Sequence, residues 1–315
     1  MIVLLSPVGG QAMHGIIEYF KGRNDRVIGI DANPEAIGRH FVDRFHVVPL
    51  VADSRYADEL LDVIRKEKVD VFISWLDPEI RFWNRWAMNP ILPFPGSMAR
   101  THTFNFRPDL GCFYDKLECV KMLKERGFCV PDTVASAFGS PMPELPCILK
   151  PRVSTGSRDV IKIEDEVAWD FHIMRLAHKG RFVAQEFIDG PEYTVDFFAD
   201  KGKVANLVVR RRLEHQGVSL RGEVVRSLAI LDIVEGIVSK FSIDGLNNMQ
   251  FIAQDGDYYA TDFNPRPSGT IMLSVRAGVD LLNNLIERKE GREITAYGKP
   301  RRLKMVRYLA DHYYV

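Results

Sequence analysis

The chain has 315 residues, more than the roughly 250 to 300 at which a single hydrophobic core stops growing, so we expect two or three lobes. Its 42 basic and 42 acidic residues cancel, which excludes a net field that would recruit nucleic acid or an anionic membrane. The four cysteines form no Cys-x-x-Cys pair and have no histidine partners at zinc spacing, which argues against a metal cluster and for unpaired thiols.

Strand and helix signals alternate through the first hundred residues. We expect strands at Ile2–Leu5, Arg26–Asp31, His46–Val48 and Val69–Ser74, with helices from about Ala12 to Lys21 and from Tyr56 to Lys66. This α/β alternation predicts a doubly wound parallel sheet. The glycines at 9, 10 and 15 do not form the Gly-x-Gly-x-x-Gly fingerprint, so we do not expect a bound dinucleotide.

The apolar run that begins at Met1 is too short for a signal segment and has no basic residue before it, so we interpret it as a buried strand. No stretch approaches the roughly 20 apolar residues that a membrane span requires. We therefore expect a soluble, cytoplasmic protein.

Asp77 follows the strand that ends at Ser74, at the carboxyl edge of the predicted sheet. Ligands bind at this edge in open α/β folds, so Asp77 is a candidate substrate residue. A helix amino-cap also explains an aspartate here and is the preferred interpretation. The segment from Trp83 to Arg107 is rich in proline, asparagine and aromatic residues, which predicts an irregular connection.

A second set of elements begins near residue 109. A helix is expected from Asp109 to Thr133, ending at Gly127, with Lys116 just inside it. The apolar strand 147–151 then delivers Lys150 at its end, and the polar loop 152–158 follows. Backbone N–H groups and hydroxyls of such a loop cradle phosphate oxygens while the ammonium neutralises their charge. A plain hairpin is the alternative.

Residues 181–196 predict a strand, a Gly-Pro break and a second strand, with Glu186 before the break and Glu192 after it. A further strand ends in three arginines, of which Arg210 and Arg212 share one face of the strand because alternate residues do. These two arginines are candidates for a phosphate group, and Arg221 is a candidate for an anionic substrate. Solvated arginines on a flexible loop are the alternative.

Residues 249–252 and 258–262 predict a β-hairpin, because Asp255-Gly256 supplies the positive backbone dihedrals of a tight turn. The hairpin brings together Gln250, Asp262, Asn264 and Arg266. Two amides, a carboxylate and a nearby cation suit Mg²⁺ carrying a polyphosphate. A hairpin that ends in an Asn-Pro turn without chemistry is the alternative.

The run Asp262-Phe263-Asn264-Pro265-Arg266 resembles the metal-binding hairpin of the ATP-grasp superfamily, whose signature is an acidic residue followed by x-Asn-Pro-Arg. Gln at position 250 is familiar in its carbamoyl-phosphate-synthase-like branch. The resemblance covers roughly residues 110 to 290. It implies a Rossmann-like pre-ATP-grasp domain at 1–105 and an ATP-grasp domain at 106–315, with a small lobe at about 128–187 and a carboxyl-terminal lobe at about 188–315.

The resemblance also implies roles for individual residues. ATP would contact Lys116, Lys150, Ser154, Thr155, Gly156, Ser157, Glu186, Phe187, Ile188 and Glu192. Mg²⁺, or Mn²⁺ in its place, would be held by Gln250, Asp262 and Asn264. The transferring phosphoryl group would be stabilised by Arg266, Lys150, Arg210 and Arg212. The substrate would contact Asp77, Arg221, Ser268 and Gly269.

The activity that the resemblance implies is an ADP-forming ligase that activates a small-molecule carboxylate as an acyl phosphate and joins it to an amine. Its partners would be these two small molecules, with a homodimer as the assembly considered. Two alternatives stay open, an ATP-grasp kinase that releases a phosphorylated small molecule and a non-catalytic sensor that binds ATP. The sequence does not identify the substrate.

Overall fold

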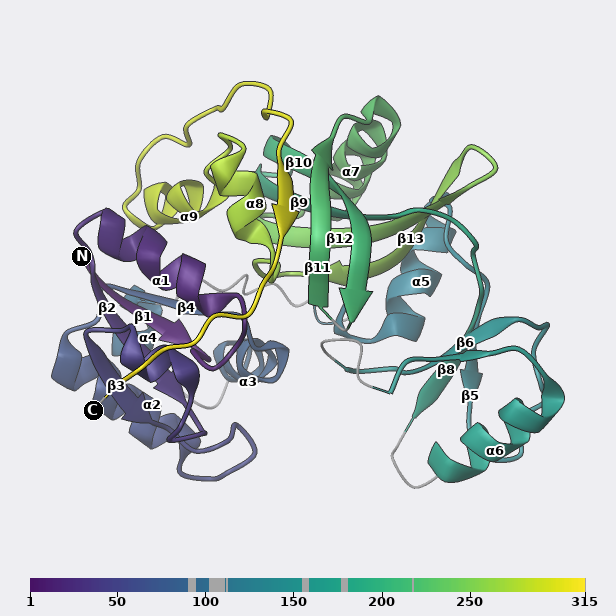
Figure 1. The fold of residues 1–315 in the computed structure, drawn as a ribbon, viewed down its shortest axis with the longest axis horizontal. Coiled ribbons are helices and arrows are strands. Elements are labelled where there is room, and N and C mark those ends of the chain that lie inside the picture. Colours follow the sequence, from purple (N-terminus) through teal and green to yellow (C-terminus); the bar gives the residue numbers. More distant parts are fainter. Residues whose placement is uncertain are drawn as a thin grey trace.

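The computed structural model describes residues 1–89, 95–101, 111, 113–154, 159–176, 181–216 and 218–314. Their strands form three separate sheets, one for each successive part of the chain (Figure 1). The amino-terminal sheet is parallel, and the other two are antiparallel. The three sheets surround one cavity, which is described below.

Four parallel strands form the amino-terminal sheet in the order β3-β2-β1-β4. The elements are β1 Ile2–Ser6, α1 Met13–Gly22, β2 Arg26–Asp31, η1 Ile37–His40, β3 Arg44–Val47, α2 Tyr56–Glu67 and β4 Val71–Ser74. Within β1, Val3 and Leu5 pack with α1, whereas Leu4 packs with α2. Because successive residues of a strand point to opposite faces, one apolar strand contributes to two cores. The predicted doubly wound parallel sheet is therefore confirmed.

The segment after β4 corrects two expectations. Asp77–Ala87 forms helix α3, and Gly96–Thr101 forms α4, so the predicted irregular connection is wrong at residues 83–87 and 96–101. Trp83 is buried, and its indole Nε1 donates to the hydroxyl of Tyr56 at 3.1 Å. The cap interpretation of Asp77 is also wrong, because Leu76 occupies the N-cap position and no side chain caps the helix.

The small lobe contains an antiparallel sheet in the order β5-β8-β6-β7. Its elements are β5 Thr133–Ser136, β6 Cys147–Pro151, β7 Ile161–Ile163, α6 Glu166–Leu176 and β8 Phe182–Glu186. Helix α6 covers one face by packing Trp169 and Leu176 against Cys147 and Leu149.

Helix α5 spans Lys116–Glu125 and lies before this lobe in the chain. It is shorter than the helix predicted over 109–133, because Asp115 caps its amino end by accepting from the backbone N–H groups of Leu117 and Glu118. Gly127, with φ of +79°, follows the last turn, since glycine takes positive φ without strain.

The carboxyl-terminal sheet has the strand order β13-β12-β9-β10-β11-β14. Its elements are β9 Glu192–Asp200, β10 Lys203–Gln216, β11 Val218–Val225, α7 Leu228–Phe241, β12 Gly245–Gln254, β13 Asp257–Asn264, α8 Ile271–Arg276, α9 Leu281–Lys289 and β14 Lys304–Val306. Val195 and Phe197 of β9 pack with α7, whereas Phe198 joins a core shared with α9 and α1. The amino-terminal and carboxyl-terminal sheets are thus held together by one continuous core.

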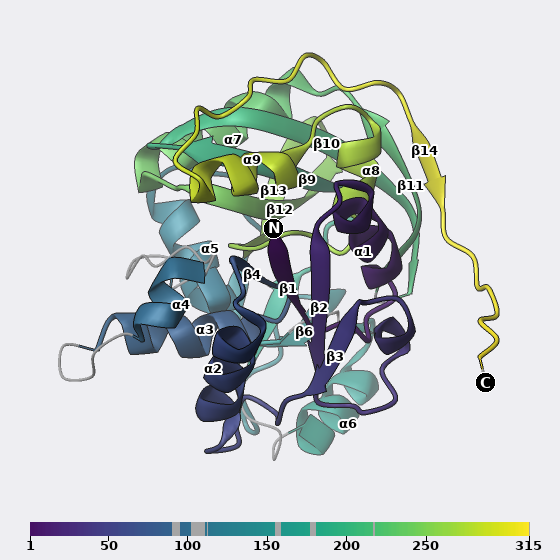
Figure 2. The same ribbon diagram turned by 90° about the vertical axis from the view of Figure 1, so that its left-hand side faces the viewer.

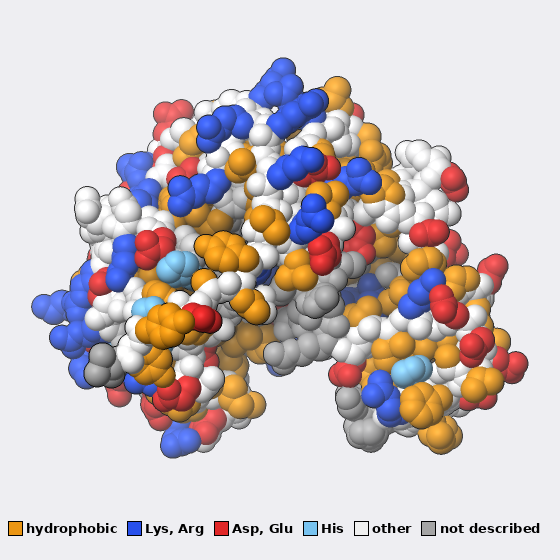
Figure 3. Space-filling view, viewed as in Figure 1, with side chains coloured by type: hydrophobic (Ala, Val, Ile, Leu, Met, Phe, Trp, Pro, Cys, Tyr) orange, Lys and Arg blue, Asp and Glu red, His pale blue; other side chains and the backbone are white. Residues whose placement is uncertain are grey.

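Figure 1 shows the carboxyl-terminal sheet above, the amino-terminal sheet at the left and the small lobe at the right. In Figure 3 the surface is hollowed between the two lower parts. After β14 the chain runs down the outside of the molecule at the right of Figure 2, and its end contacts η1. No helix among the described residues has the length and apolar character needed to cross a membrane.

Candidate functional site

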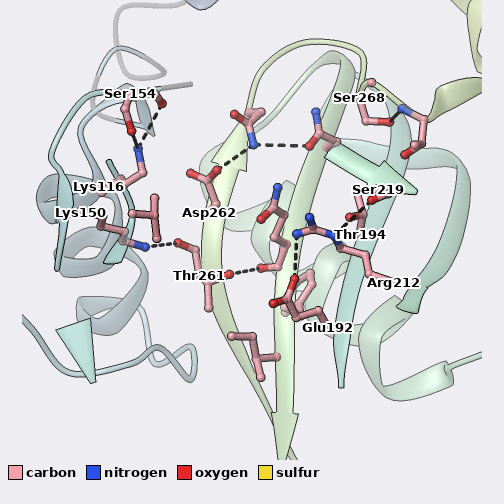
Figure 4. A pocket seen from close by; sticks show the side chains of 18 of the residues that line it. Lys116, Lys150, Ser154, Glu192, Thr194, Arg212, Ser219, Thr261, Asp262 and Ser268 are labelled. Carbon is pink, nitrogen blue, oxygen red and sulfur yellow. Dashed lines mark hydrogen bonds and ion pairs between the residues drawn. The ribbon is translucent and has the colours of Figure 1, made fainter. Parts of the chain in front are cut away.

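A cavity of about 780 Å³ lies where the three sheets meet. The small lobe contributes Lys116, Lys150 and Ser154 to its wall, counting α5 with that lobe. The carboxyl-terminal sheet contributes Thr194, Arg212, Gln250, Asp262 and Asn264, and the amino-terminal sheet contributes the turn 10–13 and Trp75. In Figure 4 the two lysines face Asp262, and Ser268 lies on the far side of the hairpin from them.

The register of the hairpin explains how its polar side chains converge. Asn248 lies opposite Asn264, and Gln250 lies opposite Asp262. Paired residues of neighbouring strands point to the same face, so these four side chains share the face that lines the cavity. A register shift follows Gln250 and leaves Thr261 without a partner across the ladder. The hairpin that the sequence predicted is therefore present.

The hairpin residues are joined by hydrogen bonds. Asn264 Nδ2 donates to Asp262 Oδ2 at 3.2 Å and to Asn248 Oδ1 at 3.4 Å. Asp262 Oδ1 has no hydrogen-bond partner among the described residues and so remains open to a ligand. The described chain has no group of three or more His, Cys, Asp or Glu side chains that could enclose a metal ion.

This donor set fits Mg²⁺ bound together with a nucleotide. Mg²⁺ usually keeps several waters and binds one or two carboxylates and substrate phosphates, rather than an all-protein cage. One open carboxylate oxygen beside the amide oxygens of Gln250 and Asn248 offers this kind of partial coordination. Asn264 Oδ1 accepts from Arg266 Nη2 at 3.3 Å, which leaves one of its two lone pairs for a metal ion.

Lys150 is buried at the end of β6, where its Nζ donates to Gln185 Oε1 at 2.7 Å and to the carbonyl of Thr261 at 3.5 Å. Burial lowers the pKa of Lys150 from 10.5 to about 8, and Lys116 lowers it further while Asp262 opposes the shift. Lys150 has no carboxylate in direct contact among the described residues, and an anion bound beside it would favour its charged form.

Lys116 occupies the first turn of α5, and its Nζ donates to Ser154 Oγ and to the Ser154 carbonyl, both at 3.2 Å. The start of the polar loop is held by Arg152, which forms an ion pair with Asp115 at 2.7 Å. Lys116, Lys150 and Ser154 are therefore brought together as the sequence suggested. Thr155, Gly156 and Ser157 lie outside the described residues.

The strand break after β8 also lines the cavity, through Glu186, Phe187 and Ile188. The carboxylate of Glu186 accepts from the backbone N–H of Asp132 at 3.0 Å. Glu192 forms an ion pair with Arg212 at 2.7 Å, and Arg212 Nε donates to Ser219 Oγ at 3.2 Å. These residues therefore share one cavity wall, and Glu192 shares its carboxylate with Arg212.

Arg210 does not line the cavity. It is 3 % exposed and forms an ion pair with the fully buried Asp196 at 2.7 Å. Its guanidinium also donates to Ser268 Oγ at 2.8 Å and to Thr270. The structure thus places Arg210 beneath the 268–270 loop, where it supports the cavity wall. The buried carboxylate on the neighbouring strand explains this position, which the alternation of the arginines alone did not predict.

Arg266 makes a two-pronged contact with Asp77, with Nε to Oδ1 at 2.5 Å and Nη2 to Oδ2 at 3.1 Å. The two residues are 189 positions apart in the chain, so the pair ties the Asn-Pro-Arg loop to the start of α3. Asp77 does not itself line the cavity among the described residues. Its contact with Arg266 gives it a positioning role.

The remaining substrate candidates separate into two groups. Ser268 and Gly269 line the cavity, whereas Arg221 is exposed on β11 opposite Val306 and does not belong to the described lining. Trp75 Nε1 donates to the carbonyl of Ser268 at 3.4 Å. We call the part of the cavity formed by residues 268–270, Trp75, the turn 10–13 and Arg307 the acceptor end.

Sequence reasoning missed several residues of this site. Asn248 precedes Gln250 by two positions in a strand, so the period-2 pattern could have found it. Gln185, the partner of Lys150, and Arg307, which donates to the carbonyl of Gly269 at 3.2 Å, gave no local signal. Both depend on contacts between segments that are distant in sequence.

The geometry agrees with comparisons to known proteins. Residues 178–312 match the model of a family described as "ATP-grasp in the biosynthetic pathway with Ter operon", and residues 3–87 match the PylC-like amino-terminal domain. These two matches support the ATP-grasp resemblance of the chain. The hairpin of β12 and β13 lies within the first matched segment, and nearly all of the parallel sheet lies within the second.

One sequence relative and two solved structures show how similar this chain is to known proteins. The arginine-specific carbamoyl phosphate synthase large chain of Geobacillus stearothermophilus is 24% identical over 294 residues, or 86% of this chain. The match spans 26% of that protein, so this chain covers about a quarter of its relative's length.

The other two are solved structures. The L-amino acid ligase of Bacillus licheniformis is 18% identical with a TM-score of 0.67, covering 94% of this chain and 77% of that one. The biotin carboxylase domain of Hydrogenobacter thermophilus 2-oxoglutarate carboxylase, in complex with MgADP, ADP and bicarbonate, is 14% identical with a TM-score of 0.71. That match covers 94% of this chain and 71% of the other. At these identities the likeness shows the fold.

Proposed function

We propose that this chain is an ADP-forming ligase of the ATP-grasp superfamily that activates a small-molecule carboxylate as an acyl phosphate and joins it to an amine. One observation carries the proposal: Lys116 and Lys150 face Asp262 and its amide neighbours across a single cavity. Two cations opposite an open carboxylate suit a nucleoside triphosphate and its metal ion, because the cations offset the phosphate charge and the carboxylate binds the metal.

Mg²⁺ would be held by Asp262 with Gln250 and Asn264, and it would neutralise phosphate charge as a Lewis acid. Lys150 and Lys116 would offset the remaining phosphate charge from the opposite wall. The segment Glu186–Ile188 would bind the adenine, and Glu192 would accept from the ribose hydroxyls.

The reaction would proceed in two displacements. A carboxylate oxygen of the substrate attacks the γ-phosphorus of ATP, and the bond to the bridging oxygen breaks to release ADP. The amine then attacks the acyl carbon, phosphate leaves, and the amine nitrogen loses a proton. Arg266 would stabilise the developing charge, because Asp77 holds its guanidinium in one orientation before the substrate binds. No side-chain nucleophile is required.

We further propose that residues 1–105 form the pre-ATP-grasp domain and residues 106–315 the ATP-grasp domain. The continuous core between α1 and α9 supports a fixed relation between the two, so that the acceptor end can combine residues from both. Small-molecule acids and amines would be the partners.

The test measures Mg²⁺-dependent ADP release with a panel of carboxylic acids in the presence of hydroxylamine, which traps acyl phosphate as hydroxamate. Hydroxamate formation in the wild type and its loss in Asp262→Asn would support the ligase. ADP without hydroxamate would instead indicate a kinase. Tight binding of ATP without turnover of any acid would indicate a sensor.

A further inference from the structure

Five cationic side chains line the cavity, and they differ in what they contact. Arg212 pairs with Glu192, and Arg266 pairs with Asp77. Lys116 and Lys150 lie on the wall that faces Asp262. Arg307 has no carboxylate within 4.0 Å in the described part of the chain, and its side chain donates only to the carbonyl of Gly269, at 3.2 Å. Among the described residues, its positive charge therefore has no paired carboxylate.

In the described cavity lining, no acidic side chain lies at the acceptor end beside Arg307. The acidic residues of the described lining are Glu186, Asp189, Glu192 and Asp262, and none of them belongs to the acceptor end. Partial burial lowers the pKa of Arg307, with no acidic group opposing the shift. Such a guanidinium remains charged and is well suited to pair with an anionic group of a ligand.

The chain holds Arg307 in place on both sides. Before it, β14 pairs with β11, and the backbone N–H of Arg307 donates to the carbonyl of Leu220 at 2.8 Å. After it, the tail reaches the end of η1, where the ring of His312 lies 4.8 Å from that of Phe41 and the ring of Tyr314 lies 4.1 Å from that of His40. Figure 2 shows this tail running down from β14 beside α1.

Arg307 is also close to the proposed centre of reaction. Gly269, which it contacts, follows Arg266 by only three residues, so the two backbone positions are at most about 10 Å apart. Both Arg266 and Arg307 line the same cavity, so a single ligand with two anionic groups has a cation available for each.

We propose that the acid substrate carries a second anionic group, a carboxylate or a phosphate, and that Arg307 binds this group and thereby determines specificity. This inference rests on the proposed ligase function. Arg307 would exchange its contact with the Gly269 carbonyl for the stronger charge-assisted contact with the substrate. The reacting carboxylate would remain at the hairpin side of the acceptor end.

The test compares acids of matched length in the hydroxamate assay: butyrate with succinate, valerate with glutarate, and glycerate with 3-phosphoglycerate. We expect the wild type to favour one of the doubly anionic acids by at least about tenfold in kcat/KM. Arg307→Ala should remove this preference by raising the KM of the favoured acid, with the KM of ATP unchanged. Arg307→Lys should restore part of it.

Arg302→Ala is the matched control, because Arg302 is exposed on the same segment and does not belong to the described lining. It should behave as the wild type. A preference for doubly anionic acids that persists in Arg307→Ala would overturn the proposal, as would a wild type that favours the singly charged acids. Circular dichroism of each variant checks that the fold is kept.

A second measurement separates failure of this inference from failure of the ligase function. The full chain is treated with phenylglyoxal, which modifies arginine, in the presence of Mg²⁺ and a non-hydrolysable ATP analogue, with succinate, glutarate or 3-phosphoglycerate added in turn. Mass spectrometry should show that at least one of these anions slows modification of Arg307 and leaves Arg302 unaffected. Protection would support the inference even without turnover. Equal modification of Arg307 with and without all three anions would overturn it.

Discussion

At the hairpin side of the cavity, Gln250, Asp262 and Asn264 lie on two adjacent strands joined by a tight turn, and the register of those strands places them on one face. At the acceptor end, Trp75, Ser268 and Arg307 come from segments far apart in the chain and meet through single hydrogen bonds. The first arrangement depends on local pairing and the second on the packing of two sheets. In the proposed function, local strand pairing positions the residues for the nucleotide, whereas packing between sheets positions those for the acid substrate.

The largest effect is expected on the nucleotide side. Lys150→Met should lower ADP release by about 100- to 1000-fold, because a preorganised cation is lost from the phosphate site. The melting temperature should not fall, since burial already disfavours the charged form of Lys150. Lys121→Met, at an exposed position of α5, is the matched control. Near-normal ADP release in Lys150→Met would show that Lys150 is not needed at the phosphate site, and the nucleotide would then have to bind elsewhere in the cavity.

A second substitution tests the contact that joins the two sides. Asp77→Asn should reduce kcat by about 10- to 100-fold with little change in the affinity for ATP, because Arg266 loses the two-pronged contact that orients it. Asp232→Asn, on the exposed face of α7, serves as the control. An increase confined to the KM of ATP would place Arg266 with the nucleotide and not with the reacting groups.

The pH dependence should come from the nucleotide side. Because burial lowers the pKa of Lys150 from 10.5 to about 8, its ammonium deprotonates in the free protein above about pH 8. We expect kcat/KM for ATP to fall by about tenfold per pH unit above that value. A pH–rate profile measures this fall, and a profile that stays level up to pH 9.5 would contradict it.

The titration of Lys150 should also affect stability: as the pH rises, activity should fall while the free energy of unfolding rises. Between about pH 8 and 10.5 the unfolded chain binds more protons at Lys150 than the folded chain does, so this residue makes the free energy of unfolding rise with pH. Lys150→Met should lack this contribution. Denaturant melts of both proteins across the same pH range separate it from other titrating groups.

The smallest effect is expected from the carboxyl-terminal tail. Replacing His312 and Tyr314 together by alanine should loosen the tail and raise the KM of the acid substrate by about two- to fivefold, with ATP unaffected. Tyr308→Ala is the control, because Tyr308 is on the same tail and 81 % exposed. If the double variant changed the KM of ATP instead, the tail would act on the hairpin side.

The parts that sequence reasoning predicted well have local causes. Alternating apolar residues and the Asp-Gly turn indicated the hairpin, and the apolar run before Lys150 indicated a strand that ends at this lysine. The strand and helix alternation indicated the parallel sheet. Errors arose at α3, where a buried Trp83 and its hydrogen bond to Tyr56 outweigh a composition typical of loops.

The sequence by itself determined which residues could carry the chemistry, because strand period, turn residues and capping residues act over a few positions. Only the tertiary structure decided their partners: Asp77 for Arg266, Asp196 for Arg210, and the Gly269 carbonyl for Arg307. Alternation along a strand sets the direction in which a side chain leaves the backbone. What that side chain meets depends on how distant segments pack, and this packing buried Arg210 while leaving Arg307 facing the cavity.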